Sequence, residues 1–147
     1  MAYNEILGTS TADAVIVGNA SGDDSLALLA GNDTVTGSGV NDIVDLGSGN
    51  DLVTQAGTYS SGSIYGAGGN DTIYTANGFS SSLADGGLGN DSIALVSSSK
   101  TFTAATLTGG LSNDTISVGK VLKSSSIYGG TTGYSSADGA DSILATS

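Results

Sequence analysis

Aspartate residues recur at a fixed spacing, and they are the residues of this chain best suited to chemistry. In the stretch GNDTVTGSGVNDIVDLGSGNDLV, residues 31–53, Asn-Asp pairs recur so that successive aspartates lie nine residues apart. A valine stands two residues after each of them. Carboxylate oxygens are the ligands that hard divalent cations, calcium above all, take in proteins. The spacing therefore indicates a row of cation sites tied to a row of buried aliphatic residues.

The composition favours cations as partners and excludes several other classes. The 147 residues include 14 acidic and 3 basic residues, which gives a net charge of -11. This charge opposes binding to nucleic acid or to an anionic membrane, and no apolar run approaches the roughly 18 residues that a membrane helix needs. Histidine and cysteine are absent, which removes the commonest general base, the usual zinc ligands and any disulfide framework.

One large aliphatic position keeps its phase through the whole chain. Its members are Ile6, Val15, Leu26, Val35, Val44, Val53, Ile64, Ile73, Leu83, Ile93, Leu107, Ile116, Ile127 and Ile143. Most steps between them are 9 to 11 residues. A disordered Gly-rich chain would not hold one aliphatic residue in phase over this length, so we expect a repeat fold.

The position two residues before each aliphatic residue divides the repeats into two alternating sets. One set carries an acid in every unit: Asp13, Asp33, Asp51, Asp71, Asp91, Asp114 and Asp141. The other set reads Asn4, Asp24, Asp42, Gly62, Ser81, Ala105 and Ser125. The true period is therefore two units. We expect one domain over residues 1–147, with acids in both sets over about 1–57 and in one set, with longer turns, over about 58–147.

Each repeat unit has one buried residue on a short strand, so it cannot fold alone and must stack on copies of itself. Val, Ile, Thr and Tyr follow the acid and glycines precede it, which is typical of a strand entered from a tight turn. The sequence thus predicts an all-β protein, a parallel β-solenoid of about seven turns with two short strands per turn. Stacked aspartates would lie about 4.8 Å apart and repel one another unless cations lie between them.

The repeat resembles the calcium-binding nonapeptide G-G-x-G-x-D-x-U-x of the RTX (repeats-in-toxin) family. Residues 86–94, GGLGNDSIA, match it, and close variants are GAGGNDTIY (66–74), LGSGNDLVT (46–54), GSGVNDIVD (37–45) and GGLSNDTIS (109–117). The resemblance covers essentially the whole chain. It implies a right-handed parallel β-roll with Ca²⁺ between successive turns, held by the aspartates and by loop carbonyls. It also implies export by type I secretion, which agrees with a first segment, MAYNEILGTS, that lacks the features of a secretory signal peptide.

Departures from the family pattern indicate where calcium is expected. The candidate ligands are Asp13, Asp33, Asp51, Asp71, Asp91, Asp114 and Asp141 on one side of the roll, and Asp24 and Asp42 on the other. Beyond residue 60 the second side offers no acid, so we expect it to be metal-free and held by Ser hydroxyls and apolar packing. Loop glycines are missing before Asp13 and Asp141, which makes these terminal slots the weakest candidates. The Asn before most of the acids is interpreted as a turn residue that tolerates a left-handed backbone.

Several functions are compatible with such a roll. An enzyme has little support, because catalytic motifs are absent and the repeat already accounts for the acid pairs. We expect no cap at either end of the solenoid, and an open sheet edge can pair with another molecule. We therefore expect a calcium-dependent extracellular structural protein that assembles head-to-tail into a filament, surface layer or matrix. The alternatives are a decoration or fibre protein of a virus particle and a calcium-stabilised adhesion or binding module.

The row of acids also predicts that calcium controls folding. Where calcium is scarce, the stacked carboxylates repel one another and the chain is expected to stay unfolded. Where calcium is abundant, its binding supplies folding free energy. We therefore expect a change from coil to β structure when calcium is added.

Overall fold

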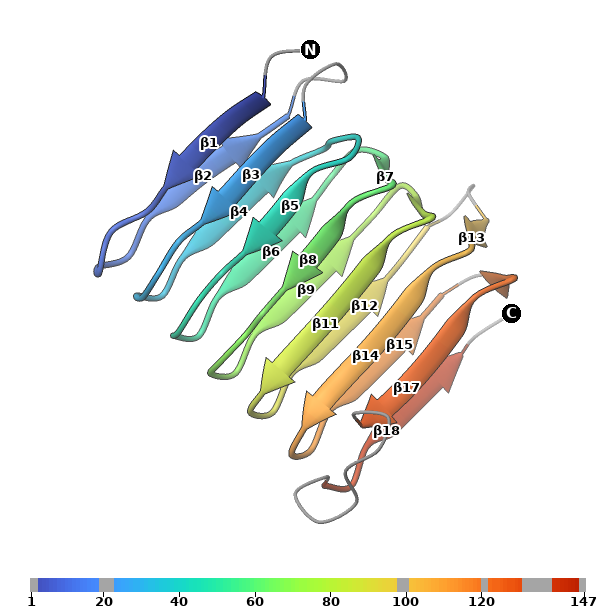
Figure 1. The fold of residues 1–147 in the computed structure, drawn as a ribbon. Helices are drawn as coiled ribbons and strands as arrows, with labels where there is room; N and C mark the ends of the chain where they lie inside the picture. Colours follow the sequence, from blue (N-terminus) through green and yellow to red (C-terminus); the bar gives the residue numbers. More distant parts are fainter. Residues whose placement is uncertain (1–2, 19–22, 98–100, 120–121, 131–138, 146–147) are drawn as a thin grey trace.

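The computed structural model describes residues 3–18, 23–97, 101–119, 122–130 and 139–145, and these residues form an all-β solenoid (Figure 1). The strands of successive turns pair in parallel, so equivalent strands lie side by side. The predicted parallel β-solenoid is confirmed. Among the described residues, the structure contains no helix that is long and apolar enough to cross a membrane.

Two sheets form the body of the solenoid in the described parts of the chain, and each has seven strands. Sheet A contains β1 (Tyr3–Leu7), β3 (Asp23–Ala27), β5 (Ile43–Asp45), β8 (Ser63–Tyr65), β11 (Leu83–Leu88), β14 (Thr106–Leu111) and β17 (Ser126–Gly130). Sheet B contains β2 (Ala14–Val17), β4 (Thr34–Gly37), β6 (Leu52–Gln55), β9 (Thr72–Thr75), β12 (Ser92–Leu95), β15 (Thr115–Val118) and β18 (Ser142–Ala145). One strand of sheet A and the strand of sheet B that follows it make one turn of the chain, which we call a rung.

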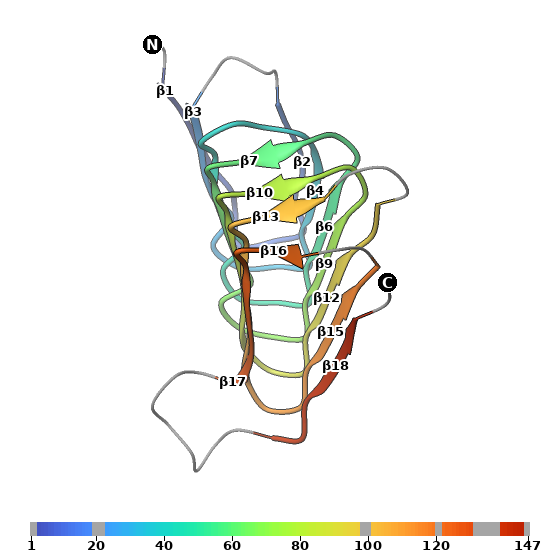
Figure 2. The ribbon, with the colours of Figure 1, turned by 90° about the vertical axis from the view of Figure 1, so that its right-hand side faces the viewer.

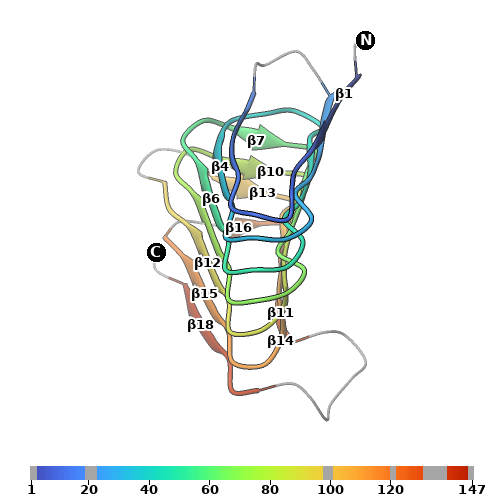
Figure 3. The ribbon, with the colours of Figure 1, turned by 90° about the vertical axis from the view of Figure 1, so that its left-hand side faces the viewer.

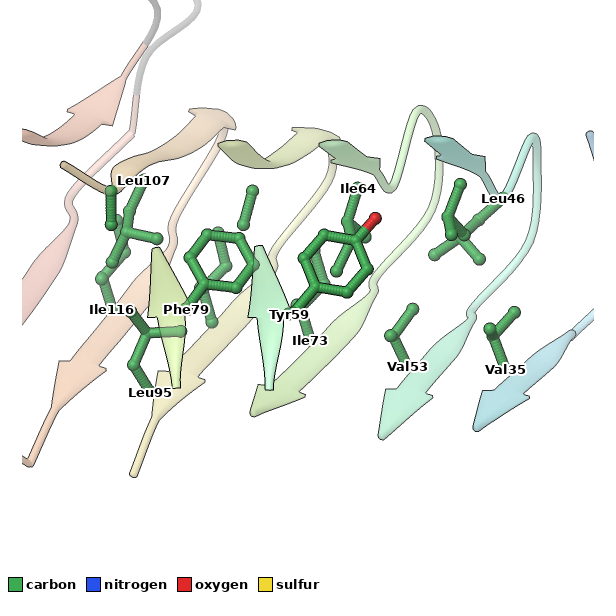
Figure 4. Close-up of a cluster of buried hydrophobic side chains, with 14 of the residues drawn as sticks. Val35, Leu46, Val53, Tyr59, Ile64, Ile73, Phe79, Leu95, Leu107 and Ile116 are labelled. Atoms are coloured by element: carbon green, nitrogen blue, oxygen red, sulfur yellow. The ribbon is translucent and has the colours of Figure 1, made fainter. Parts of the chain in front are cut away.

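The core consists of inward-facing aliphatic residues that stack from rung to rung (Figure 4). The inward column of sheet A contains Leu26, Val44, Ile64, Ala84 and Leu107, and that of sheet B contains Val35, Val53, Ile73, Ile93 and Ile116. Each of these residues is at most 1% exposed. Because neighbouring residues of a strand face opposite sides, this burial fixes the register: a slip by one residue would turn the whole column towards solvent.

One aliphatic position differs from the sequence-based prediction. The repeat predicts Leu83 as the inward residue of its strand, but Ala84 is the fully buried residue and pairs with Ile64. Leu83 instead pairs with Ser63. The residue that replaces the acid in this rung is therefore Ser82 rather than the predicted Ser81. The inward residue here is small, so a pattern that looks for the largest aliphatic residue shifts by one position.

Four rungs contain a third short strand, where the sequence predicts only two strands per turn. These strands are β7 (Tyr59–Ser60), β10 (Phe79–Ser80), β13 (Phe102–Thr103) and β16 (Leu122–Lys123), and they form sheet C. Tyr59, Phe79 and Phe102 point inward and are fully buried. The rings of Tyr59 and Phe79 stack with their centroids 5.6 Å apart and their planes 9° from parallel. Three large rings thus fill a space that two thin sheets would leave open.

Sheet C makes the two edges of the solenoid different. Along one edge, sheets A and B are joined by narrow turns, whereas along the other they are held apart by sheet C (Figures 2 and 3). We call the narrow edge, whose turns carry the aspartates from Asp13 to Asp141, the acid edge. We call the wide edge, which carries sheet C together with Asp24 and Asp42, the aromatic edge.

Candidate calcium-binding column

The turns of the acid edge place one aspartate immediately before each strand of sheet B. These turns bend sharply at glycines such as Gly69 and Gly89, whose φ angles of 133° and 118° would strain any other residue. Five of the seven aspartates are at most 3% exposed: Asp33, Asp51, Asp71, Asp91 and Asp114. Asp13 and Asp141, in the first and last rungs, are half-buried. The structure therefore brings all seven predicted residues of this set into one column.

A ladder of hydrogen bonds joins these aspartates from rung to rung. In every case the backbone N–H of one aspartate donates to Oδ1 of the aspartate in the next rung. The pairs are Asp13–Asp33 (2.7 Å), Asp33–Asp51 (2.7 Å), Asp51–Asp71 (2.8 Å), Asp71–Asp91 (2.7 Å), Asp91–Asp114 (2.8 Å) and Asp114–Asp141 (2.9 Å). One oxygen of each carboxylate in rungs two to seven is thereby used to hold the column together.

The second oxygen, Oδ2, has a different environment. Within the part of the chain that the structure describes, the buried Oδ2 atoms of Asp33, Asp51, Asp71 and Asp91 have no hydrogen-bond partner. Leaving one buried polar atom unsatisfied costs about 1–3 kcal/mol, and more when the group is charged. Several such atoms in one column are therefore a strong destabilising feature unless a cation binds them.

Burial also changes the acidity of the column. It raises the pKa of Asp71 to about 7 and that of Asp91 to about 6, although a backbone hydrogen bond to each carboxylate acts in the opposite direction. Neighbouring carboxylates raise both pKa values further. Burial likewise raises the pKa of Asp51. The charged column is thus unfavourable by itself, and either protons or cations relieve it.

Glycines open a space beside several of these Oδ2 atoms. A methyl group added at Gly66 would lie 2.5 Å from Asp71 Oδ2 and closer still to the carbonyl oxygen of Gly86 in the next rung. Gly86 and Gly109 have the same relationship to the next two aspartates, at 2.5 and 2.6 Å, again with a carbonyl oxygen of the following rung beside them. Carboxylate and carbonyl oxygens thus converge in a place that only glycine leaves free.

This donor set fits calcium. Calcium takes six to eight oxygen ligands and accepts carboxylates and backbone carbonyls in a flexible geometry. In the described residues, no three acidic side chains gather at one point. The aspartates alone therefore cannot complete a coordination shell, and the carbonyl oxygens of the glycine turns must supply further ligands.

Comparison with known protein families agrees with this chemistry. A family model, the RTX calcium-binding nonapeptide repeat (4 copies), matches residues 15–53 and 62–80. These two segments are similar to RTX calcium-binding repeats. Such repeats bind Ca²⁺, and calcium is therefore the cation of this β-roll. No curated protein and no solved structure matches the chain.

The glycine space is not present in every rung. In the second and third rungs the position equivalent to Gly66 is occupied by Leu28 and Leu46, as the matching backbone hydrogen bonds to the next rung show. Both leucines are fully buried. Their side chains fill space on the inner side of the turn that glycine leaves open in later rungs. The sequence predicted equivalent calcium sites in all non-terminal rungs. The structure shows two kinds of site, one beside a glycine and one beside a buried leucine.

The first rung of the acid edge has its own arrangement. The carboxylate of Asp13 accepts hydrogen bonds from the backbone N–H of Thr9 at 2.7 Å and from the Thr9 hydroxyl at 3.2 Å. Thr9 therefore satisfies oxygen atoms that stay without a partner in the inner rungs. This contact gives a physical reason for the sequence-based ranking of Asp13 among the weaker candidates.

The aromatic edge brings Asp24 and Asp42 together as the sequence predicts. The backbone N–H of Asp24 donates to Asp42 Oδ1 at 3.0 Å, and Asn4 Nδ2 donates to Asp24 Oδ1 at 3.0 Å. Asp42 is 1% exposed, and its Oδ2 has no hydrogen-bond partner among the described residues. Burial, together with the charges of Asp24 and Asp23, raises its pKa. This pair repeats the acid-edge arrangement for a single step.

Beyond Asp42 the aromatic edge replaces carboxylates by hydroxyl groups. The hydroxyl of Tyr59 approaches the carbonyl oxygens of Asp42, at 2.7 Å, and Ser63, at 3.1 Å. In later rungs a serine hydroxyl accepts the backbone N–H that an aspartate would otherwise accept. These bonds run from Gly62 to Ser82 (3.3 Å) and from Ala105 to Ser125 (3.0 Å). The expected serine column is therefore present, with Ser82 in place of Ser81.

The asparagines before the aspartates form a second ladder, which the sequence did not predict. Asn50 Oδ1 accepts the backbone N–H of Asn70 at 2.8 Å and its side-chain amide at 3.2 Å, and Asn70 Oδ1 receives the same two bonds from Asn90. The Asn ladder runs in the opposite direction to the Asp ladder. Of the six asparagines interpreted as left-handed turn residues, only Asn41 has a positive φ, of 62°. In the sequence, the one sign of this ladder is that the asparagines recur at the same spacing as the aspartates that follow them.

Proposed function

We propose that this chain is a non-enzymatic, extracellular structural protein whose roll folds when calcium binds the acid edge and which then stacks head-to-tail. One observation carries the proposal. Four buried carboxylates of a single column each have one oxygen without a partner among the described residues, in a chain whose repeats bind calcium. RTX repeats are also typical of secreted proteins that meet extracellular calcium.

The proposed ligands are the carboxylates of the acid edge and the carbonyl oxygens of its turns. Asp71, Asp91 and Asp114 have both the glycine space and the neighbouring carbonyl, so they form the strongest sites. Asp33 and Asp51 lie beside a leucine at the glycine position and form weaker sites. The end residues Asp13 and Asp141 and the pair Asp24 and Asp42 on the aromatic edge complete the proposed set.

Calcium then acts as the folding trigger. Without it, folding must bury several carboxylates whose pKa values are raised by that burial. A ligand that binds only the folded chain stabilises it in proportion to RT ln(1 + [L]/Kd). Several sites on one column add such contributions. The chain is therefore expected to be unfolded in cytosolic calcium and folded in extracellular calcium.

End-on stacking follows from the strands at the ends of the sheets. Within the described residues, β1 and β2 pair on one side only, with β3 and β4, and β17 and β18 pair only with β14 and β15. A parallel strand with one free side offers unpaired N–H and C=O groups to another strand. A second copy can continue both sheets, and a contact between unlike ends builds an open filament.

The proposal is tested by circular dichroism and electron microscopy of the same sample. Titration with calcium is expected to convert coil to β structure, and a chelator is expected to reverse the change. With saturating calcium, rods longer than one chain are expected in micrographs. A β spectrum that persists in chelator would overturn the folding trigger. Single particles at all calcium concentrations would overturn the stacking and leave a monomeric binding module as the function.

A further inference from the structure

The outward face of sheet B carries no charged side chain, although the chain has a net charge of -11. Its 14 outward residues, two from each of the seven described strands, are Ala, Ile, Leu, Tyr, Ser or Thr. The outward face of sheet A, by contrast, carries Glu5, Asp23, Asp45 and Asp85. We call the uncharged surface the B face.

Large apolar side chains are exposed on the B face. Ile16 is 80% exposed, Leu144 is 55% exposed, and Leu52 and Tyr74 are 40% and 38% exposed. Exposed apolar residues are normal when they are scattered singly. Here they share one uncharged surface with threonines and serines, which is the composition of a contact surface rather than of a solvated one.

The outward column of the B face that contains Tyr74 is nearly symmetric about the middle strand. Strand β9 is the fourth of seven in the sheet order. In the outward column through Tyr74, a large aliphatic residue stands at each end: Ile16 in β2 and Leu144 in β18. Thr36 and Ser117, each one rung inside an end, are both small hydroxyl residues. Read from either end, this column therefore presents nearly the same sequence of side chains. Next to the middle strand the match is weaker, since Thr54 corresponds to Ala94 and, in the neighbouring column, Leu52 corresponds to Ser92.

From this symmetry we propose that the B face binds the B face of a second copy of this chain. The two solenoid axes are antiparallel, and the two-fold axis runs along β9. Tyr74 of each copy then meets Tyr74 of the other, and Ile16 meets Leu144. In the neighbouring outward column, Thr34 meets Thr115. A two-fold contact of this kind uses the same surface on both copies and closes after two.

Electrostatics selects this face among those available to a second copy. Two chains of charge -11 repel each other, and repulsion is strongest where acids would face acids, as on sheet A or the acid edge. The B face is the broad surface on which two copies approach without bringing like charges together. Its dimensions, about 34 Å by about 13 Å from seven rungs and four residues per strand, bury roughly 900 Å² in a pair. That area belongs to weak, reversible complexes.

The pairing needs the folded roll but not the end-on stacking, because the two contacts use different surfaces. It is tested by sedimentation velocity in saturating calcium over a range of concentrations. Side-by-side pairing of chains or of end-on rods is expected, and Tyr74→Glu is expected to weaken this pairing at least ten-fold by placing two acids on the axis. Tyr128→Glu is the matched control, since Tyr128 is 41% exposed on the sheet A side. Equal effects of the two substitutions would overturn the proposal.

Cross-linking tests the orientation and does not depend on any loss of stability. The chain has no cysteine, so single cysteines can be introduced at will. A mixture of the Thr36→Cys and Ser117→Cys chains is expected to form a disulfide heterodimer in excess over either homodimer, whereas end-on stacking would leave these two positions rungs apart. Tyr74→Cys is expected to form a homodimer faster than Tyr128→Cys. Preferred Thr36→Cys homodimers, or no difference between the two tyrosine positions, would overturn the antiparallel arrangement.

Discussion

The backbone N–H of Asp71 donates a hydrogen bond to Oδ1 of Asp91, one rung away, at 2.7 Å. The same carboxylate has a second buried oxygen, Oδ2, with no partner among the described residues. The two oxygen atoms of this one side chain thus have different roles. Oδ1 fixes the register of the rungs whether or not a metal is bound, whereas Oδ2 stabilises the fold only when a cation or a proton satisfies it.

Substituting Asp71 by Asn tests the second role. Asn keeps an Oδ1 acceptor for the N–H of Asp51 but replaces the charged Oδ2 by an amide that cannot bind calcium. Asp71→Asn is expected to raise the calcium concentration needed for half-folding about ten-fold, because the proposed site loses a charged ligand. Calcium titration followed by circular dichroism measures it. Asp45→Asn is the control: Asp45 is exposed on sheet A, and its substitution should leave the midpoint unchanged. An unchanged midpoint for Asp71→Asn would remove Asp71 from the site.

Acid is expected to replace calcium as the stabilising factor. The pKa of Asp71 is raised to about 7 and that of Asp91 to about 6 by burial, so the folded chain binds protons more tightly than the unfolded chain. Groups of this kind stabilise the fold fully below the unfolded pKa near 3.8 and lose that contribution as pH rises through 6 and 7. In chelator, β structure should therefore appear near pH 4 to 5, an expected range set by this linkage. With saturating calcium the pH dependence over this range should be much weaker.

Melting curves in chelator at a series of pH values give the measurement. Stability that increases from acid towards neutral pH in the absence of calcium is the opposite sign and would contradict the burial of charged carboxylates. The Asp71→Asn chain supplies a comparison, since it lacks a carboxyl whose pKa is raised to about 7 and should show a smaller pH dependence of stability as pH rises towards that value.

Much of this fold follows from the sequence, because periodicity is a property of the whole chain rather than of one residue. The aspartate column of the acid edge and the separate pair of Asp24 and Asp42 on the aromatic edge depend on a repeated spacing that many units report together. The position of Ala84 was predicted wrongly because a single small residue carried the signal. The acid-edge sites of the second and third rungs differ because Leu28 and Leu46 occupy a position that the nonapeptide gives to glycine.

Sheet C and the Asn ladder required the structure. Tyr59, Phe79 and Phe102 keep the period of the inward residues of sheet A, each five residues before one of them, but only three rungs carry this signal. Only folding shows that they stack in one column. The asparagines have the right period, but their side chains have two common uses in turns, and sequence does not distinguish a left-handed backbone from a hydrogen bond to the next rung.

Filling the glycine space should weaken calcium binding beside Asp71 and strain the contact with the next rung. Gly66→Ala places a methyl group 2.5 Å from Asp71 Oδ2, where something must shift. Gly68→Ala is the matched control two residues along the same turn, because a methyl group there meets nothing within 4 Å and Gly68 has no positive φ. Isothermal titration is expected to give a lower calcium stoichiometry or affinity for Gly66→Ala and no change for Gly68→Ala. Identical binding by the two chains would place the ion elsewhere.

The Tyr59 hydroxyl is expected to stabilise the part of the aromatic edge where aromatic rings take the place of carboxylates. It approaches the carbonyl oxygens of Asp42 and Ser63, and the Tyr59 ring also closes the space beside Gly62. Tyr59→Phe keeps the ring and its stack on Phe79 but removes a buried hydrogen bond to the Asp42 carbonyl, which keeps its bond from the Ser63 N–H. The free energy of unfolding in calcium should therefore fall by about 0.5–1.5 kcal/mol. Denaturant titration measures this difference. Tyr65→Phe, on the outward face of sheet A, should change stability by less than about 0.5 kcal/mol. A Tyr59→Phe chain as stable as the parent would mean that ring packing alone replaces the acids at this edge.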